Sequence, residues 1–389
     1  MNILFYRYGS ICEPDIIDAF KSFGVVVFEE TSEISRKNIP GEKRIEILAR
    51  AILTNDIHFV FSINFFPHIS DVCERLHRTY ICLSVDCPVL ELLSSSIQNK
   101  CNKIFLFDYM QYLRFSPQNP DGIFYLPLAT NVARWDFVIE TAPPQKHVAY
   151  SNDISFVGSL YTEKSPLKNL HLSQYAEGFL SGLTNAQAHL GRTYFLEDAF
   201  TENIISEIKN SSSFPNVLKP HSEPDRYIVA NYYWGIQVAE QERIHTLNTL
   251  AAQFPVTIYT RSDTSSLQNI HCCGGISTLT EMPLVFHNSK INLNITIPTI
   301  QSGLSLRVWD ILGCGGFLLS NYQQEIPTYL TIGQDLDCYE TIDELIEKVQ
   351  YYLKHDDIRT EIAAHGYETV RQKHTWKHRI AEMFKIIVG

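Results

Sequence analysis

One stretch of the sequence combines the residue types that bind anionic ligands. Residues 292–320 read NLNITIPTIQSGLSLRVWDILGCGGFLLS, which predicts a strand, a polar loop and a short helix that ends at a glycine-rich turn. Gly303 frees the backbone in the loop, and Ser305 is placed to cap the helix. The amides of the first helical turn are then unpaired, and Arg307 adds a planar cation that suits a phosphate. The segment therefore predicts an anion site.

Asp310 follows Arg307 by three residues, about one helical turn further along. A carboxylate just behind a phosphate site can accept hydrogen bonds from the hydroxyl groups of a ribose. The same spacing also fits an ordinary surface ion pair between Arg307 and Asp310. The spacing alone leaves both interpretations open.

Two series of alternating strands and helices must position these residues. In the first series, short apolar runs predict strands at 1–6, 25–28, 59–63, 80–85, 103–107 and 123–126. In the second series, the predicted strands lie at 154–157, 256–259, 291–295 and 317–320. This alternation predicts an α/β fold with two Rossmann-like, mostly parallel sheets, and we expect the two domains to face each other across a ligand-binding cleft.

The composition changes between the two series. Residues 141–153 (TAPPQKHVAYSND) carry two prolines and lack apolar periodicity, which predicts a linker. We therefore expect an N-terminal domain over residues 1–140 and a C-terminal domain over residues 154–374. A mainly helical and polar pattern from about 160 to 235 indicates an insertion in the second domain. Residues 375–389 predict a last helix that crosses back to the first domain.

The overall composition excludes several classes of protein. The chain has 389 residues, of which 45% are hydrophobic and 19% charged, so it is folded rather than disordered. Its formal net charge of -11 disfavours general binding to nucleic acids or anionic membranes. Its apolar runs are shorter than the roughly 20 residues that span a bilayer, and no signal-peptide pattern is present at the start. We expect no membrane segment.

The cysteines and the absence of several short motifs disfavour further classes of site and enzyme. Nine cysteines are scattered along the chain without a CxxC pair, which predicts free thiols in a reducing compartment, the cytoplasm. They do not form a zinc ligand set, and His374 and His378, four residues apart, lack a third ligand nearby. No GxGxxG follows the first strand, and the GxxxxGK[ST] and GxSxG motifs are absent, which disfavours a dinucleotide dehydrogenase, a P-loop enzyme and a serine hydrolase.

Taken together, the motifs resemble the GT-B glycosyltransferases and, within these, the CgeB-like family associated with spore maturation. Residues 292–320 carry the clearest likeness, with strand asparagines, a small-residue loop, RVWD at 307–310 and GCGG at 313–316. Further segments that carry it are NFFP (64–67), VDCP (85–88), FLFD (105–108), LPLATN (126–131), TEMP (280–283), YET (339–341), HGY (365–367) and HTWKHR (374–379). The resemblance covers most of the chain and is weakest over residues 160–225.

This resemblance implies that the second domain binds a nucleotide-sugar donor. In GT-B folds the glycine loop after the first strand of that domain, here Gly158-Ser159, faces the donor phosphates, and Arg261 could reach the same phosphates. An ordinary strand end and an exposed loop arginine remain alternatives for these positions. The expected donor-binding residues are Gly158, Ser159, Arg261, Asn294, Ser302, Gly303, Leu304, Ser305, Arg307 and Asp310.

One position departs from the pattern of the resembled enzymes. Many retaining GT-B enzymes carry two glutamates eight residues apart ahead of the glycine-rich strand. Asp310 fits the second of these positions, but Ser302 stands where the first acid would be. The sequence therefore leaves retaining and inverting chemistry open.

An inverting transferase also needs a base that deprotonates the acceptor hydroxyl. Glu13, His68 and Asp86 each follow a predicted strand of the first domain, at the edge where open α/β sheets build their sites. Asp86 is favoured because it lies in a rigid Asp-Cys-Pro turn that resembles the family's Asp-Ser-Pro. Its alternative role is to cap a helix that begins near Pro88.

The function predicted on this basis is transfer of a sugar from a nucleotide diphosphate donor to a hydroxyl of a glycan or protein acceptor. No metal or cofactor is expected, because Arg307 and the helix amides would stabilise the leaving diphosphate. Asp335-Leu336-Asp337 matches the DxD metal signature of the other major glycosyltransferase fold, but we expect a solvated loop there. The alternatives are a nucleotide-sugar epimerase or hydrolase of the same fold, and a non-catalytic nucleotide-sugar-binding or scaffold protein.

Overall fold

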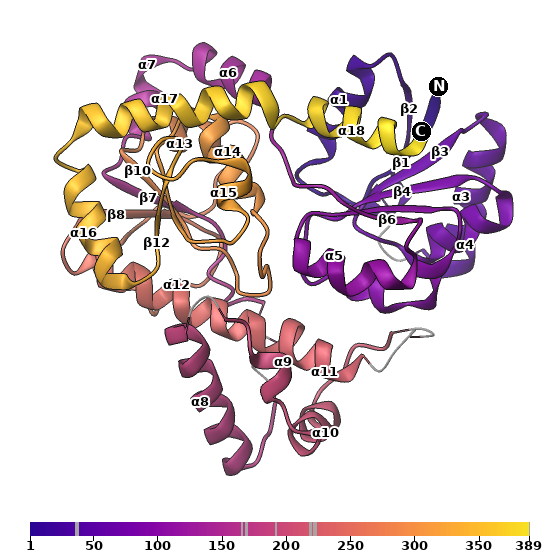
Figure 1. The fold of residues 1–389 in the computed structure, drawn as a ribbon, viewed down its shortest axis with the longest axis horizontal. Coiled ribbons are helices and arrows are strands. Elements are labelled where there is room, and N and C mark those ends of the chain that lie inside the picture. The colour runs from indigo at the N-terminus through magenta and orange to yellow at the C-terminus, as the bar shows by residue number, and fades with distance from the viewer. Residues whose placement is uncertain are drawn as a thin grey trace. The chain divides into compact units, whose positions relative to one another are not determined.

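The structure, a computed structural model, describes residues 1–35, 39–164, 166–167, 170–190, 193–217, 220 and 224–388 (Figure 1). It divides into two compact units. The first unit comprises Met1–Thr130, Val217–Pro224 and His374–Gly389, and the second comprises Asn131–Asn216 and Asp225–Lys373. Each unit is built on its own six-stranded parallel sheet, which confirms the predicted α/β class with two Rossmann-like sheets.

The sheet of the first unit has the strand order β2-β1-β3-β4-β5-β6. Its strands are β1 (Asn2–Tyr6), β2 (Val26–Glu30), β3 (Phe59–Ile63), β4 (Thr79–Leu83), β5 (Asn102–Leu106) and β6 (Ile123–Tyr125). All five residues of β3 are buried, as expected for a central strand whose two faces are both covered by helices. This explains why the strands of the first unit appear in the sequence as short continuous apolar runs.

Helices of the first unit follow its strands in regular alternation. They are α1 (Glu13–Ser22), α2 (Ser32–Ser35), α3 (Gly41–Thr54), α4 (Pro67–Leu76), η1 (Leu90–Leu93), η2 (Ser95–Gln98), α5 (Tyr109–Phe115), η3 (Ser116–Gln118) and α18 (Trp376–Val388). The FLFD motif ends in the cap of α5, because the Asp108 carboxylate accepts a hydrogen bond from the Gln111 amide at 2.7 Å.

The last helix, α18, is tied to the segment that follows β6. Buried Arg379 donates through Nε to the Pro127 carbonyl at 2.8 Å and through Nη2 to Nδ1 of His374 at 2.7 Å. The backbone of Thr130 accepts from the Trp376 amide at 3.1 Å and donates to the His374 carbonyl at 3.3 Å. The LPLATN and HTWKHR motifs are therefore two parts of one packed element of the first unit, and His374 has a structural role there.

The sheet of the second unit has the strand order β12-β11-β10-β7-β8-β9. Its strands are β7 (Ile154–Val157), β8 (Val256–Tyr259), β9 (His271–Cys272), β10 (Ile291–Asn294), β11 (Leu318–Asn321) and β12 (Asp337–Tyr339). The sequence predicts the four central strands and misses β9 and β12. These two edge strands have only two and three residues, which is too short for an apolar run to stand out.

The second unit also contains most of the helices. They are α6 (Val132–Thr141), α7 (Pro144–Ala149), α8 (Gln174–Leu190), α9 (Leu196–Ala199), α10 (Glu202–Ser211), α11 (Asp225–Tyr227), the π-helix η4 (Ile228–Trp234), α12 (Gly235–Ala251), α13 (Met282–Asn288), α14 (Leu306–Gly313), α15 (Ile326–Tyr329), α16 (Ile342–Tyr352) and α17 (Asp356–Lys373). Helix α7 forms within the segment that was expected to be a linker, and α6 groups with the second unit rather than the first.

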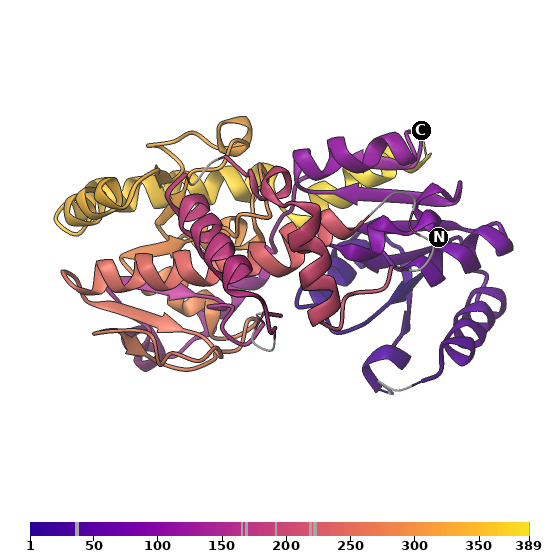
Figure 2. The same cartoon turned by 90° about the horizontal axis from the view of Figure 1, so that it is seen from below.

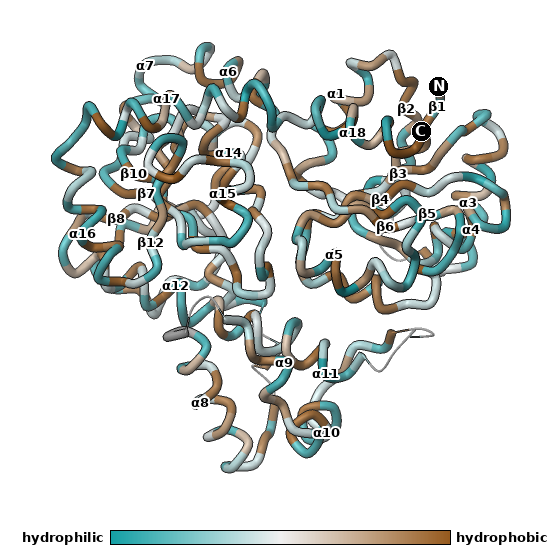
Figure 3. The backbone as a smooth tube through the Cα atoms, in the orientation of Figure 1, coloured by the Kyte–Doolittle hydropathy of each residue, from teal (hydrophilic) through white to brown (hydrophobic). Residues whose placement is uncertain are grey.

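One face of the second sheet is covered by α12 and α16. Their apolar side chains, including Leu247, Leu250, Leu345 and Val349, pack on the strands in a single buried cluster. Hydrophobic residues accordingly lie along the strands in both units (Figure 3). The insertion helices α8 to α11 lie below α12 in Figure 1 and are seen from beneath in Figure 2. Trp234 anchors them, since its indole donates to Thr184 of α8 at 2.9 Å.

The remaining predictions about composition concern thiols and membranes. All nine cysteines carry free thiols, as their spacing predicts. Within the part of the chain that the structure describes, no helix has both the length and the apolar character that crossing a membrane requires.

Candidate functional site

Each parallel sheet has a point where the strand order reverses, and this point is where open α/β sheets bind ligands. In the second unit the chain runs outward from β7 through β8 to β9, and then outward on the other side from β10 through β11 to β12. The reversal therefore lies between β7 and β10. In the first unit it lies between β1 and β3. The carboxyl ends of these strand pairs position the candidate functional residues.

A buried arginine lies at the reversal point of the second unit. Arg243 of α12 donates through Nη1 to the Ser159 carbonyl and through Nη2 to the Ile295 carbonyl, each at 2.6 Å. Its guanidinium also stacks on the Tyr161 ring, 4.7 Å from the centroid. Arg243 is 9% exposed, and its Nε has no hydrogen-bond partner among the described residues. A positive charge is thus held between the ends of β7 and β10.

Arg243 was not among the predicted site residues, although the sequence carries a signal for it. The buried positions of α12 include Ala239, Arg243, Thr246 and Leu250, which recur every three or four residues. Arg243 is therefore a cation on the buried face of an amphipathic helix. Such a residue requires partners inside the protein, which is an argument for a functional or structural role.

The predicted loops after β7 and β8 lie side by side. The Ser159 hydroxyl donates to Glu163 at 2.9 Å and lies 3.4 Å from the Ser262 hydroxyl, which accepts from the Leu160 amide at 2.8 Å. Gly158 is tightly enclosed, because a Cβ there would lie 3.3 Å from the Phe156 ring. These contacts bring the Gly158-Ser159 loop next to the exposed Arg261.

Helix α14 begins where the sequence predicts, but its cap differs. Ser305 occupies the N-cap position, yet its hydroxyl makes no capping hydrogen bond and is buried without a partner among the described residues. The predicted side-chain cap is therefore wrong, because the Ser305 hydroxyl does not turn back onto the helix amides. The amino end of α14 keeps an unused hydroxyl beside the positive end of the helix dipole.

Arg307 and Asp310 are brought together on α14. An Arg307 Nη1 atom lies 3.7 Å from Asp310 Oδ2, and the two side chains are 23% and 10% exposed. The guanidinium also packs over the Phe286 ring at 5.1 Å and contacts the Met282 sulfur, both in α13. The pair is therefore partly buried between α13 and α14 and differs from an ordinary exposed surface ion pair.

Ser302 is hydrogen-bonded to a carboxylate, Glu325, that was not among the predicted site residues. The buried Ser302 hydroxyl donates to Glu325 Oε1 at 2.6 Å, and the Glu325 amide donates to the Ser302 carbonyl at 3.1 Å. Glu325 follows β11 and is 8% exposed. The sequence lacks an acid at position 302, but the fold supplies one from another loop. No sequence spacing predicts this contact, because 23 residues separate the two side chains.

The other predicted residues of this loop are enclosed by the protein. The Asn294 amide donates to the Thr296 hydroxyl at 3.0 Å and to the Ser320 hydroxyl at 2.9 Å, so it connects the ends of β10 and β11. Leu304 is a buried core residue, and Gly303 beside it is buried as well. These contacts indicate that Asn294 and Leu304 support the loop.

At the reversal point of the first unit, Asn64 holds the predicted base Asp86 together with Tyr8, which was not predicted. Its Nδ2 donates to the Tyr8 hydroxyl at 2.9 Å and to Asp86 Oδ2 at 2.6 Å. Its Oδ1 accepts from the amides of Val85 and Asp86 at 3.0 and 3.3 Å. Asn64 adopts a left-handed conformation with φ of 57°, which asparagine tolerates better than most residues. The exposed Asp86 carboxylate is therefore fixed in position.

The environment of Asp86 favours it over the other candidate bases. Burial, and then the charge of Asp86, raise the pKa of the Tyr8 phenol, so that this hydroxyl stays protonated. The Asp86 carboxylate remains accessible, and its Cys87–Pro88 peptide bond is cis. An accessible carboxylate held by an amide at the end of a parallel strand can accept a proton from a bound hydroxyl.

Glu13 has a structural role instead. It is completely buried, and Oε1 accepts from the amides of Tyr8, Gly9 and Ser10 at 2.8, 2.9 and 3.1 Å. Its other oxygen pairs with Arg7 at 2.9 Å. These bonds engage both oxygens of the carboxylate. Glu13 therefore shapes the loop after β1, which disfavours the predicted role as a base.

His68 is also poorly suited to act as the base. Its ring packs against those of Tyr6 and Phe66, with centroids 5.7 Å away in both cases. Its Nε2 is buried without a partner among the described residues. Burial, and then the Arg44 guanidinium, lower the pKa of His68 to about 4, so the ring is neutral near pH 7.

This depressed pKa predicts a loss of stability in weak acid. The unfolded chain binds a proton at His68 near the ordinary pKa of 6.5, whereas the folded chain binds one only near 4, so acid favours unfolding. We expect the His68 contribution to fall by about 2 kcal/mol between pH 7 and pH 5. Urea unfolding at the two pH values should show a smaller loss for His68→Gln. The exposed control His365→Gln should behave like the unsubstituted protein; equal losses in all three proteins would contradict the assignment.

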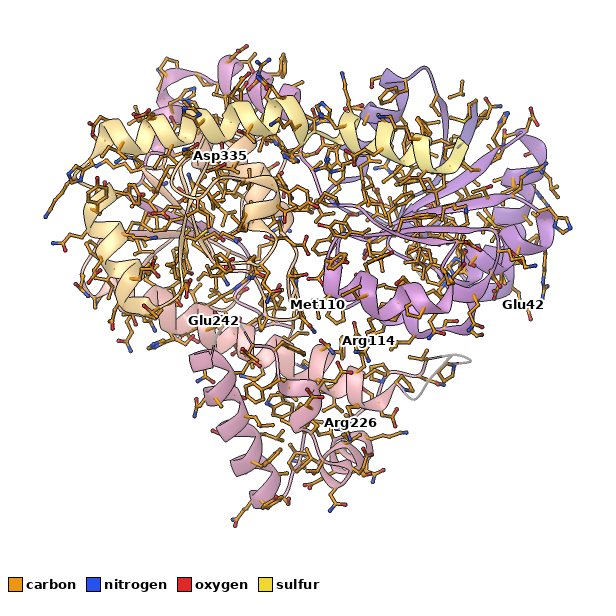
Figure 4. All side chains as sticks on the ribbon, in the orientation of Figure 1. Glu42, Met110, Arg114, Arg226, Glu242 and Asp335 are labelled. Carbon is orange, nitrogen blue, oxygen red and sulfur yellow. The ribbon has the colours of Figure 1, made fainter. Side chains whose placement is uncertain are left out.

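The prediction of a solvated loop at Asp335-Leu336-Asp337 is wrong. Asp335, labelled in Figure 4, is buried and accepts from the Thr369 hydroxyl at 2.8 Å. Asp337 begins β12 and is buried as well, accepting from Lys348 Nζ at 3.0 Å and from the Tyr352 hydroxyl at 2.7 Å. Both carboxylates are therefore engaged by side chains of the second unit. The sequence could not show this, because the partners lie 11 to 34 residues further along the chain.

Comparison with known proteins places this geometry in context. Residues 241–385 match the family described as Glycosyl transferase-like. No curated protein matches the sequence. Among solved structures, Anabaena Alr3699/HepE in complex with UDP-glucose is similar, with a TM-score of 0.55, 8% identity, and coverage of 100% of this chain and 99% of that chain. The chain has the GT-B fold, with a glycosyl transferase-like segment over residues 241–385.

Two further solved structures are similar to this chain over nearly its whole length. T4 phage BGT in complex with its UDP-glucose substrate gives a TM-score of 0.53 at 9% identity, and the alignment covers 100% of this chain and 99% of that chain. Sucrose-phosphate synthase from Thermosynechococcus elongatus gives a TM-score of 0.52 at 11% identity, and the alignment covers 99% of this chain and 98% of that chain. At such low identity these likenesses establish the fold, and the functional argument depends on the residues of this chain.

Proposed function

We propose that the protein transfers a sugar from a nucleotide diphosphate donor to a hydroxyl of a glycan or protein acceptor. The observation that carries this proposal is the position of the family match. Residues 241–385 include Arg243, α14 with Arg307, and every loop at the carboxyl edge of the second sheet except the one after β7. The similar HepE and BGT structures contain UDP-glucose, which supports a nucleotide-sugar donor. The motifs also support a place in the CgeB-like group.

In this proposal the second unit binds the donor. Arg307, the amino end of α14 and the unused Ser305 hydroxyl supply the groups that favour an anion. Arg243 adds a fixed positive charge at the ends of β7 and β10. These groups would stabilise the negative charge that develops on the leaving diphosphate, so a metal ion is not required for that step.

The first unit, in turn, activates the acceptor. Asp86 accepts the proton of the acceptor hydroxyl while the acceptor oxygen forms a bond to the anomeric carbon of the sugar. The bond from that carbon to the diphosphate breaks, and the electron pair leaves with the diphosphate. Asn64 keeps the Asp86 carboxylate in position through its 2.6 Å hydrogen bond. A base in this role corresponds to inversion at the anomeric carbon.

The proposal is tested by donor binding followed by turnover. A thermal-shift screen of UDP-, GDP- and ADP-sugars should find a donor that raises the melting temperature, because a ligand specific for the folded state stabilises it. That donor is then incubated with a panel of glycan and peptide acceptors, with and without EDTA. Nucleotide diphosphate release that depends on the acceptor and survives EDTA is expected. An altered sugar without any acceptor would indicate an epimerase or hydrolase, and binding without turnover a scaffold.

A further inference from the structure

The second unit contains a cavity of about 990 Å³ that the donor residues do not line. Its wall is formed by the loops after β10, β11 and β12, by α12, by the start of α16 and by Tyr194. Glu242, labelled on α12 in Figure 4, lies on this wall. The volume lies at the upper end of the range typical of small-molecule sites, so the cavity can hold a ligand of several rings.

The chemistry of the wall indicates the class of ligand. Carboxamide side chains are the most frequent polar groups, among them Gln237, Gln241, Asn321 and Gln324. Carboxylates and tyrosines make up much of the rest, and no lysine or arginine is among the lining residues that the structure describes. Amides and carboxylates bind hydroxyl groups by donating and accepting, and aromatic rings offer apolar faces to sugar rings. The absence of cations among these lining residues disfavours a phosphate.

One side chain on this wall has an unused hydrogen-bonding group. Tyr339, in β12, is 5% exposed, and its hydroxyl is buried without a partner among the described residues. A buried hydroxyl without a partner is costly, so its presence favours a ligand that completes the bond. Glu242 lies close enough to influence Tyr339 electrostatically, and burial raises the pKa of Glu242 to about 7. Near neutral pH this carboxyl group can either donate to or accept from a ligand hydroxyl.

We propose that this cavity binds an uncharged, polyhydroxylated ligand, that is a sugar or a short neutral glycan. The site is distinct from the proposed donor site, because Arg307, Arg261 and Ser305 do not line it. Arg243, which the donor proposal also uses, is not a lining residue but lies close enough to act electrostatically on Tyr339 and Glu242. The two sites share one structural element, since Thr296, Pro298 and Gln301 of the cavity wall lead directly into the Ser302–Ser305 loop. A glycan in the cavity would thus lie against the same loop that precedes α14.

The inference is tested by direct binding, which does not depend on transferase activity. Maltopentaose and cellopentaose serve as neutral probes and glucose 6-phosphate as the charged probe, with calorimetry and saturation-transfer NMR as readouts. We expect a neutral probe to bind and the phosphorylated probe to bind more weakly. Tyr339→Phe should raise the dissociation constant of the neutral probe by about tenfold, which is the effect of losing one well-made hydrogen bond. It should leave the melting temperature of the empty protein unchanged or raised, because it removes an unpartnered hydroxyl.

Matched variants separate this site from other sources of binding. Gln324→Ala changes an exposed residue of the wall and should weaken binding of the neutral probe without affecting the fold. Tyr351→Phe changes a residue outside the cavity and should leave binding of the probe unchanged. Arg307→Ala should leave glycan binding intact even if the donor proposal fails. The inference is overturned if no neutral probe binds at millimolar concentration, if Tyr339→Phe and Gln324→Ala bind as tightly as the unsubstituted protein, or if a nucleotide displaces the glycan competitively.

Discussion

Replacing Asp86 with asparagine is expected to lower kcat by about 10²–10⁴-fold, the range that positioned general bases contribute. Asparagine keeps the size of the side chain and an oxygen that can accept from Asn64, whose Nδ2 lies 2.6 Å from Asp86 Oδ2. It cannot accept the proton of the acceptor hydroxyl. The loss should therefore appear in kcat, with little change in donor affinity or melting temperature. Steady-state kinetics with saturating acceptor, together with donor titration, measure both quantities.

A matched control keeps this prediction specific. Asp121→Asn changes an exposed carboxylate in the turn before β6 and should retain full activity. The anomeric configuration of the product provides a second readout, since an acceptor base belongs to an inverting displacement. Retention of configuration, or a kcat for Asp86→Asn within about threefold of the unsubstituted enzyme, would remove Asp86 from the mechanism. The alternative role as a helix cap is already wrong, because the helix after Pro88 begins at Leu90 and has Val89 at its N-cap.

The sheets could be predicted from the sequence because their central strands are buried on both faces. Such strands produce continuous apolar runs, for example FVFSI at Phe59–Ile63. Glycine and polar turns separate these runs, so the alternation with helices is visible without any knowledge of contacts. The short strands β9 and β12 lack this signal. Their pairing depends on neighbours that are already in place, which is information that only the folded sheet contains.

The candidate site could be predicted only where its residues lie close together in the sequence. Arg307 and Asp310 are three residues apart on one helix, so helical geometry alone brings them together. Glu325 reaches Ser302 from a different loop, and Asn64 reaches Asp86 across 22 residues. These contacts depend on the order of strands in the sheet. The roles of Glu325 and Asn64 therefore became visible only in the structure.

The burial of two carboxylates explains why the prediction of a solvated loop at Asp335-Leu336-Asp337 was wrong. Asp335 and Asp337 look like loop residues because carboxylates are mostly exposed, and the flanking sequence shows no apolar period. In the structure each carboxylate has protein partners, so its burial is compensated. Glu13 illustrates the same point, since three amides and Arg7 hold it inside the protein. Residue type and spacing identify a charged group, but only its partners reveal whether it is structural or available for catalysis.

The second large effect is expected at the donor site, where Arg307→Ala should lower kcat/KM by about 10²–10³-fold. This is the range observed when a group that stabilises transition-state charge is removed. Because Arg307 is placed to contact both the bound donor and the departing diphosphate, we expect weaker donor titration as well as slower turnover. Arg307→Lys keeps the charge but loses the planar fork, so an intermediate effect is expected.

Stability must be separated from function in this variant. Arg307 lies 3.7 Å from the mostly buried Asp310 and packs on Phe286, so its removal is expected to cost about 1 kcal/mol of unfolding free energy. Activity is therefore compared at a temperature where both proteins are fully folded. Arg50→Ala serves as the control, because its pair with Glu46 is exposed and contributes little. Donor titration by calorimetry decides the result: an unchanged dissociation constant in Arg307→Ala would place the diphosphate elsewhere and leave the Arg307–Asp310 pair with a structural role only.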